Sequence, residues 1–278
     1  MKPQLVPYLL YEPEESGILW IKFNRPERMN AIVGSAEPNG TVAKVVEYMQ
    51  AGDDDPNIRV IVLTGVGRGF CSGADLRGAP EGFQREESSE PPGPDSSRQR
   101  FFHKFTKLFR EISLIRKPTI AMVNGPAMGA GMDISLHCDL RVGSENARFF
   151  TYQNVGQIIE NGALYYLPRI AGLGRALELA YTGGFLEAQR AYEWGVLNRL
   201  VPAEKLEEET RTLCDRIIKS PPLVQWINKR IMRAGLDSSL ETVMVMTSNA
   251  AGILGASEDS REARQAFLER RTPSFKGR

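Results

Sequence analysis

Apolar and polar residues alternate with two different periods in the first half of this chain. Gly17–Phe23 alternates as a half-buried strand does, and the β-branched run Arg59–Thr64 is typical of a central strand. Between them, apolar side chains recur at helical spacing through Thr41–Ala51. A further apolar run, Pro118–Val123, indicates another buried strand. Strands that alternate with helices in this order predict an α/β protein with a repeated ββα unit.

Helical periodicity dominates the chain from Gly162 onward. Short strands are expected before it, near Leu140–Val142 and at Phe149–Tyr152. Glycines divide the first helical part into short helices, whereas longer helices follow Val201-Pro202. The predicted helices span residues 163–170, 174–182, 187–194, 204–219, 222–233, 240–251 and 257–270. We therefore expect a core of residues 1–200 and a C-terminal helical region of residues 201–278.

Residues 78–97 lack the apolar periodicity of a helix or a strand. The segment is rich in Glu, Pro, Gly and Ser, which predicts a mobile loop. It directly follows a glycine-rich stretch, so it is either a flap over a site there or a plain surface insertion. The next stretch, 99–115, predicts an amphipathic helix with an aromatic stripe on one side.

Composition narrows the class of protein further. The chain has 278 residues, 42% of them hydrophobic, which is enough for a sizeable core. Its 35 basic and 34 acidic residues nearly cancel, so bulk charge favours neither nucleic acid nor a membrane surface. No apolar run approaches the ~20 residues that span a bilayer, and no signal peptide or peroxisomal tripeptide is recognisable. Because Cys71, Cys138 and Cys214 fit neither a disulfide framework nor a zinc spacing, we expect a cytoplasmic protein without a metal site.

The stretch Lys117–Asp133 joins a predicted strand to a helix through a turn of small residues. Asn124-Gly125-Pro126 ends the strand, Gly129-Ala130-Gly131 follows, and Met132–Cys138 predicts a buried helix. Such a turn leaves backbone N–H groups unpaired at the helix start. They suit an anion, or an oxygen that becomes anionic during a reaction. The alternative is a glycine-rich turn that only packs the helix close to the sheet.

Two segments, Gly67–Leu76 and Lys117–Asp133, together resemble the signature segments of the crotonase (enoyl-CoA hydratase/isomerase) superfamily. Further segments match the family in its order along the chain. They are Asn24-Arg25-Pro26 with Asn30-Ala31, Leu167-Pro168-Arg169, Trp194–Asn198 and Phe267–Arg278. The resemblance implies a crotonase-type spiral of ββα units with a C-terminal helical trimerisation region. It also implies a homotrimer or a dimer of trimers.

An oxyanion hole is the first chemical feature that the resemblance implies. Its donors would be the backbone N–H groups of Ala74 and Ala130, which polarise the thioester oxygen as an enolate forms. Loss of one such donor typically costs ~3–4 kcal/mol. Most relatives carry glycine where this chain has Ala130, and the added methyl group restricts φ and narrows the approach to the thioester.

The acid/base residues depart from the pattern of the family's hydratases, which hold water between two glutamates. Asp133 stands at the first of these positions, and the second falls near Tyr152-Gln153, where there is no carboxylate. Glu160 falls where dienoyl-CoA isomerases and chlorobenzoyl-CoA dehalogenases place a catalytic carboxylate. We therefore expect Glu160, with or without Asp133, to move the proton. The alternatives are a favourable charge near a helix start for Glu160 and a helix-orienting role for Asp133.

Coenzyme A would be held by a separate set of residues. By resemblance, the pantetheine and adenine side is lined by Arg25, Arg28, Ala31, Ala74, Asp75 and Leu76. Phe267 and Arg270 match residues of the last helix that reach the CoA of a neighbouring subunit. Arginine suits phosphate geometry, and the alternative for all three arginines is a solvated surface position.

The function that follows is chemistry on an acyl-CoA thioester by an enoyl-CoA hydratase/isomerase-type enzyme. CoA would belong to the substrate, and no other cofactor is needed. A dienoyl-CoA isomerase or a thioester hydrolase on the same scaffold stays open, as does a non-catalytic acyl-CoA-binding protein. RNA binding, which some relatives show, is disfavoured by the neutral charge.

We expect His137 to be a structural histidine with its hydrogen bonds satisfied.

Overall fold

The computed structural model describes residues 3–34, 38–75, 105–152 and 156–278. The chain forms two compact units. The first comprises Met1–Ile115 and Thr119–Thr210, and the second comprises Arg116–Pro118 and Arg211–Arg278. The division in the last third of the chain therefore falls inside helix α8 (Leu206–Ile218). The predicted loop at 78–97 lies outside the described residues.

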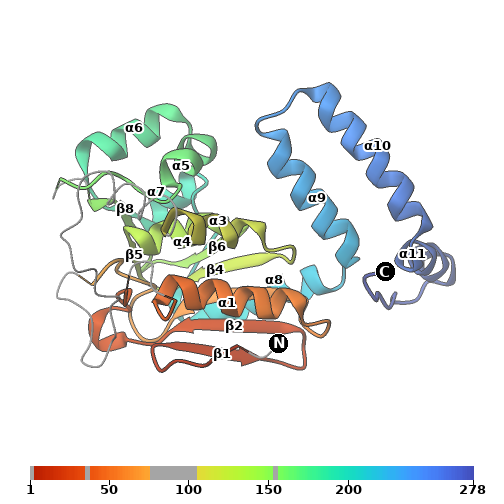
Figure 1. The fold of residues 1–278 in the computed structure, drawn as a ribbon, viewed down its shortest axis with the longest axis horizontal. Coiled ribbons are helices and arrows are strands. Elements are labelled where there is room, and N and C mark those ends of the chain that lie inside the picture. Colours follow the sequence, from red (N-terminus) through yellow and green to blue (C-terminus); the bar gives the residue numbers. More distant parts are fainter. Residues whose placement is uncertain (1–2, 35–37, 76–104, 153–155) are drawn as a thin grey trace. The chain divides into compact units, whose positions relative to one another are not determined.

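A six-stranded sheet in the order β1-β2-β3-β4-β6-β9 runs through the first unit (Figure 1). The edge strand β1 is antiparallel to β2, and every later neighbour in the sheet is parallel. β3 and β4 are buried along almost their whole length, as expected for parallel strands covered on both faces. The strands are β1 (Leu9–Pro13), β2 (Ile18–Phe23), β3 (Val60–Gly65), β4 (Thr119–Val123), β6 (Leu140–Ser144) and β9 (Arg199–Val201).

Three helices pack together beside this sheet. They are α1 (Thr41–Asp54), α3 (Lys107–Leu114) and α4 (Ala130–His137). α1 contacts β1 and β2, α3 contacts both α1 and α4, and α4 contacts β4 (Figure 1). α4 is buried through nearly all of its length, which confirms the predicted apolar helix after the glycine-rich turn. This position brings the start of α4 beside the C-terminal ends of the parallel strands.

A smaller sheet of three strands contains the segment that leads into α4. Its order is β5 (Pro126–Met128), β7 (Arg148–Phe150) and β8 (Leu186–Glu187). β5 follows directly from the predicted turn at 124–126 and pairs in parallel with β7, so Met128 lies opposite Phe150. The helices after β7 in this unit are α5 (Ala163–Ala171), α6 (Leu173–Thr182) and α7 (Ala188–Glu193). All three were predicted from glycine-divided helical periodicity.

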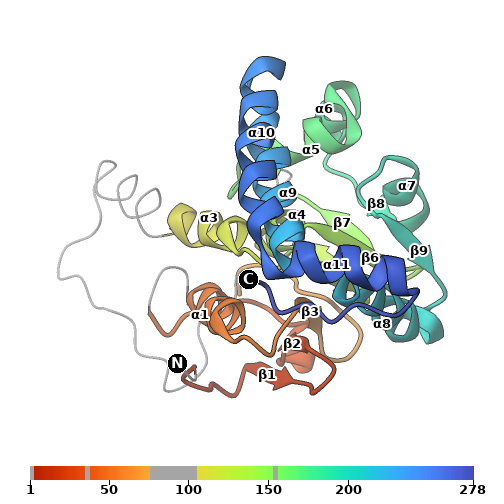
Figure 2. The same ribbon diagram turned by 90° about the vertical axis from the view of Figure 1, so that its right-hand side faces the viewer.

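The second unit is helical, as predicted. Beyond α8 it contains α9 (Pro222–Gly235), α10 (Leu240–Ala256) and α11 (Glu258–Glu269), which Figure 2 shows in a second view. Ser239 and Ser257 cap the last two helices, because their hydroxyl oxygens accept the N–H groups of Thr242 and Ser260. Among the helices that the structure describes, none has both the length and the apolarity needed to cross a membrane.

Candidate active site

Backbone hydrogen bonds join the two glycine-rich segments into one surface. Cys71 and Ala127 form an isolated parallel bridge. The N–H groups of Phe70 and Cys71 donate to the carbonyl of Pro126 at 3.1 Å, and the N–H of Met128 donates to the carbonyl of Cys71 at 2.9 Å. The segment that carries Ala74 therefore lies against the segment that enters α4.

The backbone N–H of Ala74 points away from Ile32, the residue with which its two neighbours pair. Ile32 pairs with the two neighbours of Ala74: its N–H donates to the Gly73 carbonyl at 2.8 Å, and its carbonyl accepts the Asp75 N–H at 3.2 Å. The polar groups of successive residues in extended chain face opposite sides, so the N–H of Ala74 faces the other way. Ala130 is the first residue of α4, where an N–H has no partner within the helix.

Gly73 brings these two amides close together. Its φ is +82°, and a side-chain carbon there would lie 2.6 Å from the Met128 carbonyl oxygen and 3.4 Å from the Ala130 nitrogen. Only glycine avoids that clash and adopts this backbone conformation without strain. The backbone N–H groups of Ala74 and Ala130 thus lie near one small region, and their role as an oxyanion hole stays a prediction.

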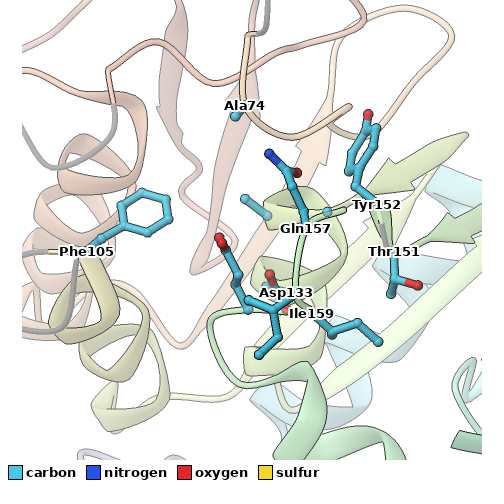
Figure 3. A pocket seen from close by; sticks show the side chains of 11 residues that line it. Ala74, Phe105, Asp133, Thr151, Tyr152, Gln157 and Ile159 are labelled. Atoms are coloured by element: carbon cyan, nitrogen blue, oxygen red, sulfur yellow. The ribbon is translucent and has the colours of Figure 1, made fainter. Parts of the chain in front are cut away.

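A pocket of about 90 Å³ opens at this region. In Figure 3, Phe105 stands on one side of the pocket, Thr151 and Tyr152 stand on the opposite side, and Asp133 lies between them. The pocket brings together all four residues predicted to be catalytic. Its lining residues are Ala74, Phe105, Gly129, Ala130, Asp133, Thr151, Tyr152, Gln157, Ile158, Ile159 and Glu160.

The two carboxyl groups of the pocket have unequal surroundings. Asp133 is in the first turn of α4 and only 3% exposed, whereas Glu160 is partly exposed in the segment that leads to α5. Burial raises the pKa of Asp133 well above its ordinary value, and the nearby charge of Glu160 adds to the effect. Burial also raises the pKa of Glu160, against a hydrogen bond from Asn161 that lowers it. Such a pair suits one proton donor and one base.

Tyr152 is a pocket residue whose contact no sequence pattern reveals. Its hydroxyl donates to the carbonyl of Ser72 at 2.8 Å, and its ring carbons lie against Gly129. Tyr152 therefore contacts both segments that supply the amide donors. The neighbouring position 153, which the sequence comparison with hydratases singles out, lies outside the described residues.

The residues predicted to hold CoA occupy several different places. Arg25 is paired with Asp75, and its guanidinium also donates to the Ala31 carbonyl at 2.8 Å. Arg28 is exposed. Leu76 lies outside the described residues. Phe267 and Arg270, both exposed, belong to the second unit.

Comparison with known proteins places the chain in a family. Residues 13–278 match the family described as Enoyl-CoA hydratase/isomerase. The chain is 32% identical over 267 residues to the 1,2-epoxyphenylacetyl-CoA isomerase of Escherichia coli K12, covering 95% of this chain and 97% of the relative. It is 30% identical over 269 residues to the crotonyl-CoA hydratase of Syntrophomonas wolfei, covering 96% of each.

Solved structures give the same assignment. The crystal structure of an enoyl-CoA hydratase from Bacillus anthracis matches with a TM-score of 0.82 at 29% identity, covering 98% of this chain and 100% of that one. The protein belongs to the enoyl-CoA hydratase/isomerase family and thus to the crotonase superfamily. The family, the α/β fold and the class of enzyme predicted from the sequence are therefore confirmed.

Proposed function

We propose that this protein isomerises the double bond of an enoyl-CoA thioester by proton transfer, with Glu160 as the base. The supporting observation is that Glu160 lines the same pocket as Ala74, Ala130 and Asp133. The ionised Glu160 removes a proton from Cα of a 3-enoyl thioester, and the electron pair passes into a dienolate. Return of a proton at Cγ gives the 2-enoyl thioester, so no atom is gained or lost.

The amides of Ala74 and Ala130 are the proposed donors to the thioester oxygen. Negative charge collects on this oxygen in the dienolate, and fixed N–H groups stabilise such charge without reorganising during the reaction. The close approach of Gly73 to Met128 and Ala130 supports this role, because it keeps the two donors near one point. Proton transfer between carbons through such a site requires no cofactor besides the CoA of the substrate.

Hydration is a second candidate, and Asp133 favours it. Burial raises the pKa of Asp133 and so favours its protonated form, in the same pocket as the Glu160 base. Glu160 would take a proton from water, hydroxide would add at Cβ of a 2-enoyl thioester, and Asp133 would protonate Cα. One relative is named as a crotonyl-CoA hydratase, which favours hydration, and the other is named as the isomerase of an epoxide rather than of a double bond.

Other parts of the proposal concern binding and assembly. The exposed Arg28 would bind a CoA phosphate, and Arg25 and Asp75, which pair with each other, would line the same CoA side of the site. Phe267 and Arg270 would reach the CoA of a neighbouring subunit in a homotrimer or a dimer of trimers. The exposed apolar residues of α10, such as Leu240, Met244 and Ile253, supply a surface for that assembly. The proposed compartment is the cytoplasm.

Incubation of 2-enoyl-, 3-enoyl- and 3,5-dienoyl-CoA in heavy water, followed by mass spectrometry, tests the proposed reaction. Double-bond movement with deuterium uptake and no added water is the expected result. Addition of one water to the 2-enoyl substrate would instead establish hydration. Release of free CoA would identify a thioester hydrolase. Binding without any conversion would identify a non-catalytic acyl-CoA binder.

A further inference from the structure

The turn between the pocket and α5 holds an asparagine in an unusual conformation. Asn161 has φ +54° and the following Gly162 has φ +110°. Left-handed backbone is uncommon outside glycine, although asparagine tolerates it better than most residues. Asn161 is also only 7% exposed. A buried asparagine in this conformation is fixed by its surroundings, and it directly follows Glu160.

His137 binds the backbone of this turn. Its Nε2 lies 2.6 Å from the Asn161 carbonyl oxygen. A carbonyl can only accept, so Nε2 carries the hydrogen and Nδ1 is the acceptor in this tautomer. The hydroxyl of Ser113 lies 2.5 Å from Nδ1, and the hydroxyl of Tyr166 lies 2.8 Å from Ser113. The ring is thus held from α3 and α5 while it holds the turn, and its hydrogen bonds are satisfied, as predicted.

Gly162 makes this approach possible. A side-chain carbon at Gly162 would lie 2.8 Å from Nε2 of His137, which would push the imidazole away from the turn. The carbonyl of Glu160 then accepts the N–H of Ala163 at 3.2 Å as α5 begins. The backbone on either side of Asn161 is therefore fixed relative to α4 and α5.

The side chain of Asn161 contacts both carboxyl groups of the pocket. Its Nδ2 lies 3.3 Å from Oδ2 of Asp133. The same amide hydrogen-bonds Glu160 and lowers the pKa of that carboxyl, opposing the effect of burial. Among the described residues, the titratable groups around Asn161 are Asp133 and Glu160, which contact its amide, His137, which binds its backbone carbonyl, and Tyr166, which lies against His137.

The other atom of the amide is buried without a partner. Oδ1 of Asn161 accepts no hydrogen bond in the part of the chain that the structure describes. A buried acceptor without a partner costs about 1–3 kcal/mol, so its retention calls for an explanation. When Asp133 holds its proton, a half-turn of the amide lets Oδ1 accept that hydrogen. One side chain can thus match either protonation state of Asp133.

We infer that Asn161 is a positioning residue for the proton-transfer pair, held in place by His137. Its amide favours the ionised forms of Asp133 and Glu160 by hydrogen bonding, against the effect of burial, and its backbone fixes the turn that presents Glu160 to the pocket. This inference rests on the proposed role of Glu160 as the base. It adds a residue that does not line the pocket and acts through two that do.

Asn161→Asp is the direct test, because aspartate keeps the size and tolerates the left-handed backbone but removes the donor. The expected result is a kcat at least tenfold lower at pH 7, with KM within threefold. The acid limb of the kcat/KM profile should move up by about one pH unit, since Glu160 loses a hydrogen bond to its ionised form and gains a like charge. The exposed Asn57→Asp is the matched control and should leave both quantities unchanged.

His137 gives a second pair of variants. His137→Gln can keep an N–H near the position of Nε2, whereas His137→Met has a similar size and no donor. We expect His137→Met to lower kcat with KM nearly unchanged. His137→Gln should keep most of the wild-type kcat. If Asn161→Asp does not fold, the two His137 variants test the positioning role of Asn161 in its place. A purely structural role would lower stability in both without separating their kcat values.

The inference is overturned if folded Asn161→Asp keeps the wild-type kcat and pH profile, or if His137→Met and His137→Gln have equal kcat values. A separate variant, Glu160→Gln, keeps this failure distinct from failure of the proposed function. Full turnover in Glu160→Gln would reject Glu160 as the base. An inactive Glu160→Gln beside an unaffected Asn161→Asp would reject only the role of Asn161.

Discussion

Arg25 and Asp75 form an ion pair with 3.0 Å between Nη2 and Oδ2, and Asp75 is the direct neighbour of the proposed donor Ala74. The side chains are only 11% and 8% exposed. Arg25 also binds the Ala31 carbonyl, and Ile32 pairs with Gly73 and Asp75. The ion pair therefore ties two loops together at the point where the Ala74 amide is presented.

Replacing Arg25 with Met should destabilise the protein and impair the site. It leaves the Asp75 carboxylate buried without its charge partner, so the free energy of unfolding should fall by about 3 kcal/mol. Urea unfolding measures this loss, and kcat should fall as Ala74 loses its support. Arg28→Met is the matched control, because Arg28 is exposed and its removal should change stability by less than about 0.5 kcal/mol. Equal stability of the two variants would contradict the structural role.

Ala130→Pro isolates one amide donor. Proline is tolerated at the first position of a helix, so the variant should fold while it lacks the N–H. We expect kcat to fall about 10²–10³-fold, the usual effect of removing an oxyanion donor. Ala130→Gly keeps the N–H and should stay within threefold of the wild type. Equal turnover in the two variants would exclude this amide from the chemistry.

Tyr152→Phe removes one hydroxyl and keeps the ring against Gly129. The lost hydrogen bond to Ser72 is worth about 0.5–1.5 kcal/mol, so kcat/KM should fall by about two- to tenfold. Steady-state kinetics measure the change. Tyr181→Phe is the control, because Tyr181 is 79% exposed. A Tyr152→Phe enzyme as active as this control would show that the hydrogen bond between Tyr152 and Ser72 is dispensable for activity.

Asp133→Asn should change how stability depends on pH. Burial in the folded protein raises the pKa of Asp133 above the value it has in the unfolded chain. Above pH ~4, the folded protein therefore binds more protons at this residue than the unfolded chain does. Stability from this group therefore falls as pH rises towards the folded pKa. The variant cannot ionise, so its free energy of unfolding should rise relative to that of the wild type as the pH rises from 5 to 8. Urea unfolding at the two pH values measures this gain, and a pH-independent difference would contradict it.

The sequence predicts the long elements well because periodicity needs length. The predicted strand at Gly17–Phe23 is β2, Ile18–Phe23, and the predicted helix at Thr41–Ala51 is α1, Thr41–Asp54. Four of the strands in the described part of the chain were not predicted. β5, β8 and β9 have only three, two and three residues, too few to show an alternation, and β1 contains Pro13 at its end.

Some residues of the candidate site could likewise be predicted from the sequence, whereas the contacts among them could not. Glu160 and Asp133 are recognisable from motifs, and the structure places both in one pocket. The contacts of Tyr152 with Ser72 and of Asn161 with Asp133 join positions 80 and 28 residues apart. No local pattern predicts such contacts. The pairing of Arg25 with Asp75 was equally hidden, and the expectation that both residues contact CoA stays a prediction.

Exchange of the Cα proton by a Glu160→Gln variant tests the central claim most directly. Enoyl-CoA is incubated with the variant in heavy water, and deuterium uptake is followed by mass spectrometry, with the exposed Glu145→Gln as control. The account predicts an exchange rate about 10²–10⁴-fold below that of the wild type, with CoA-thioester binding retained. Exchange at the wild-type rate in Glu160→Gln would contradict it and would assign the base to another group.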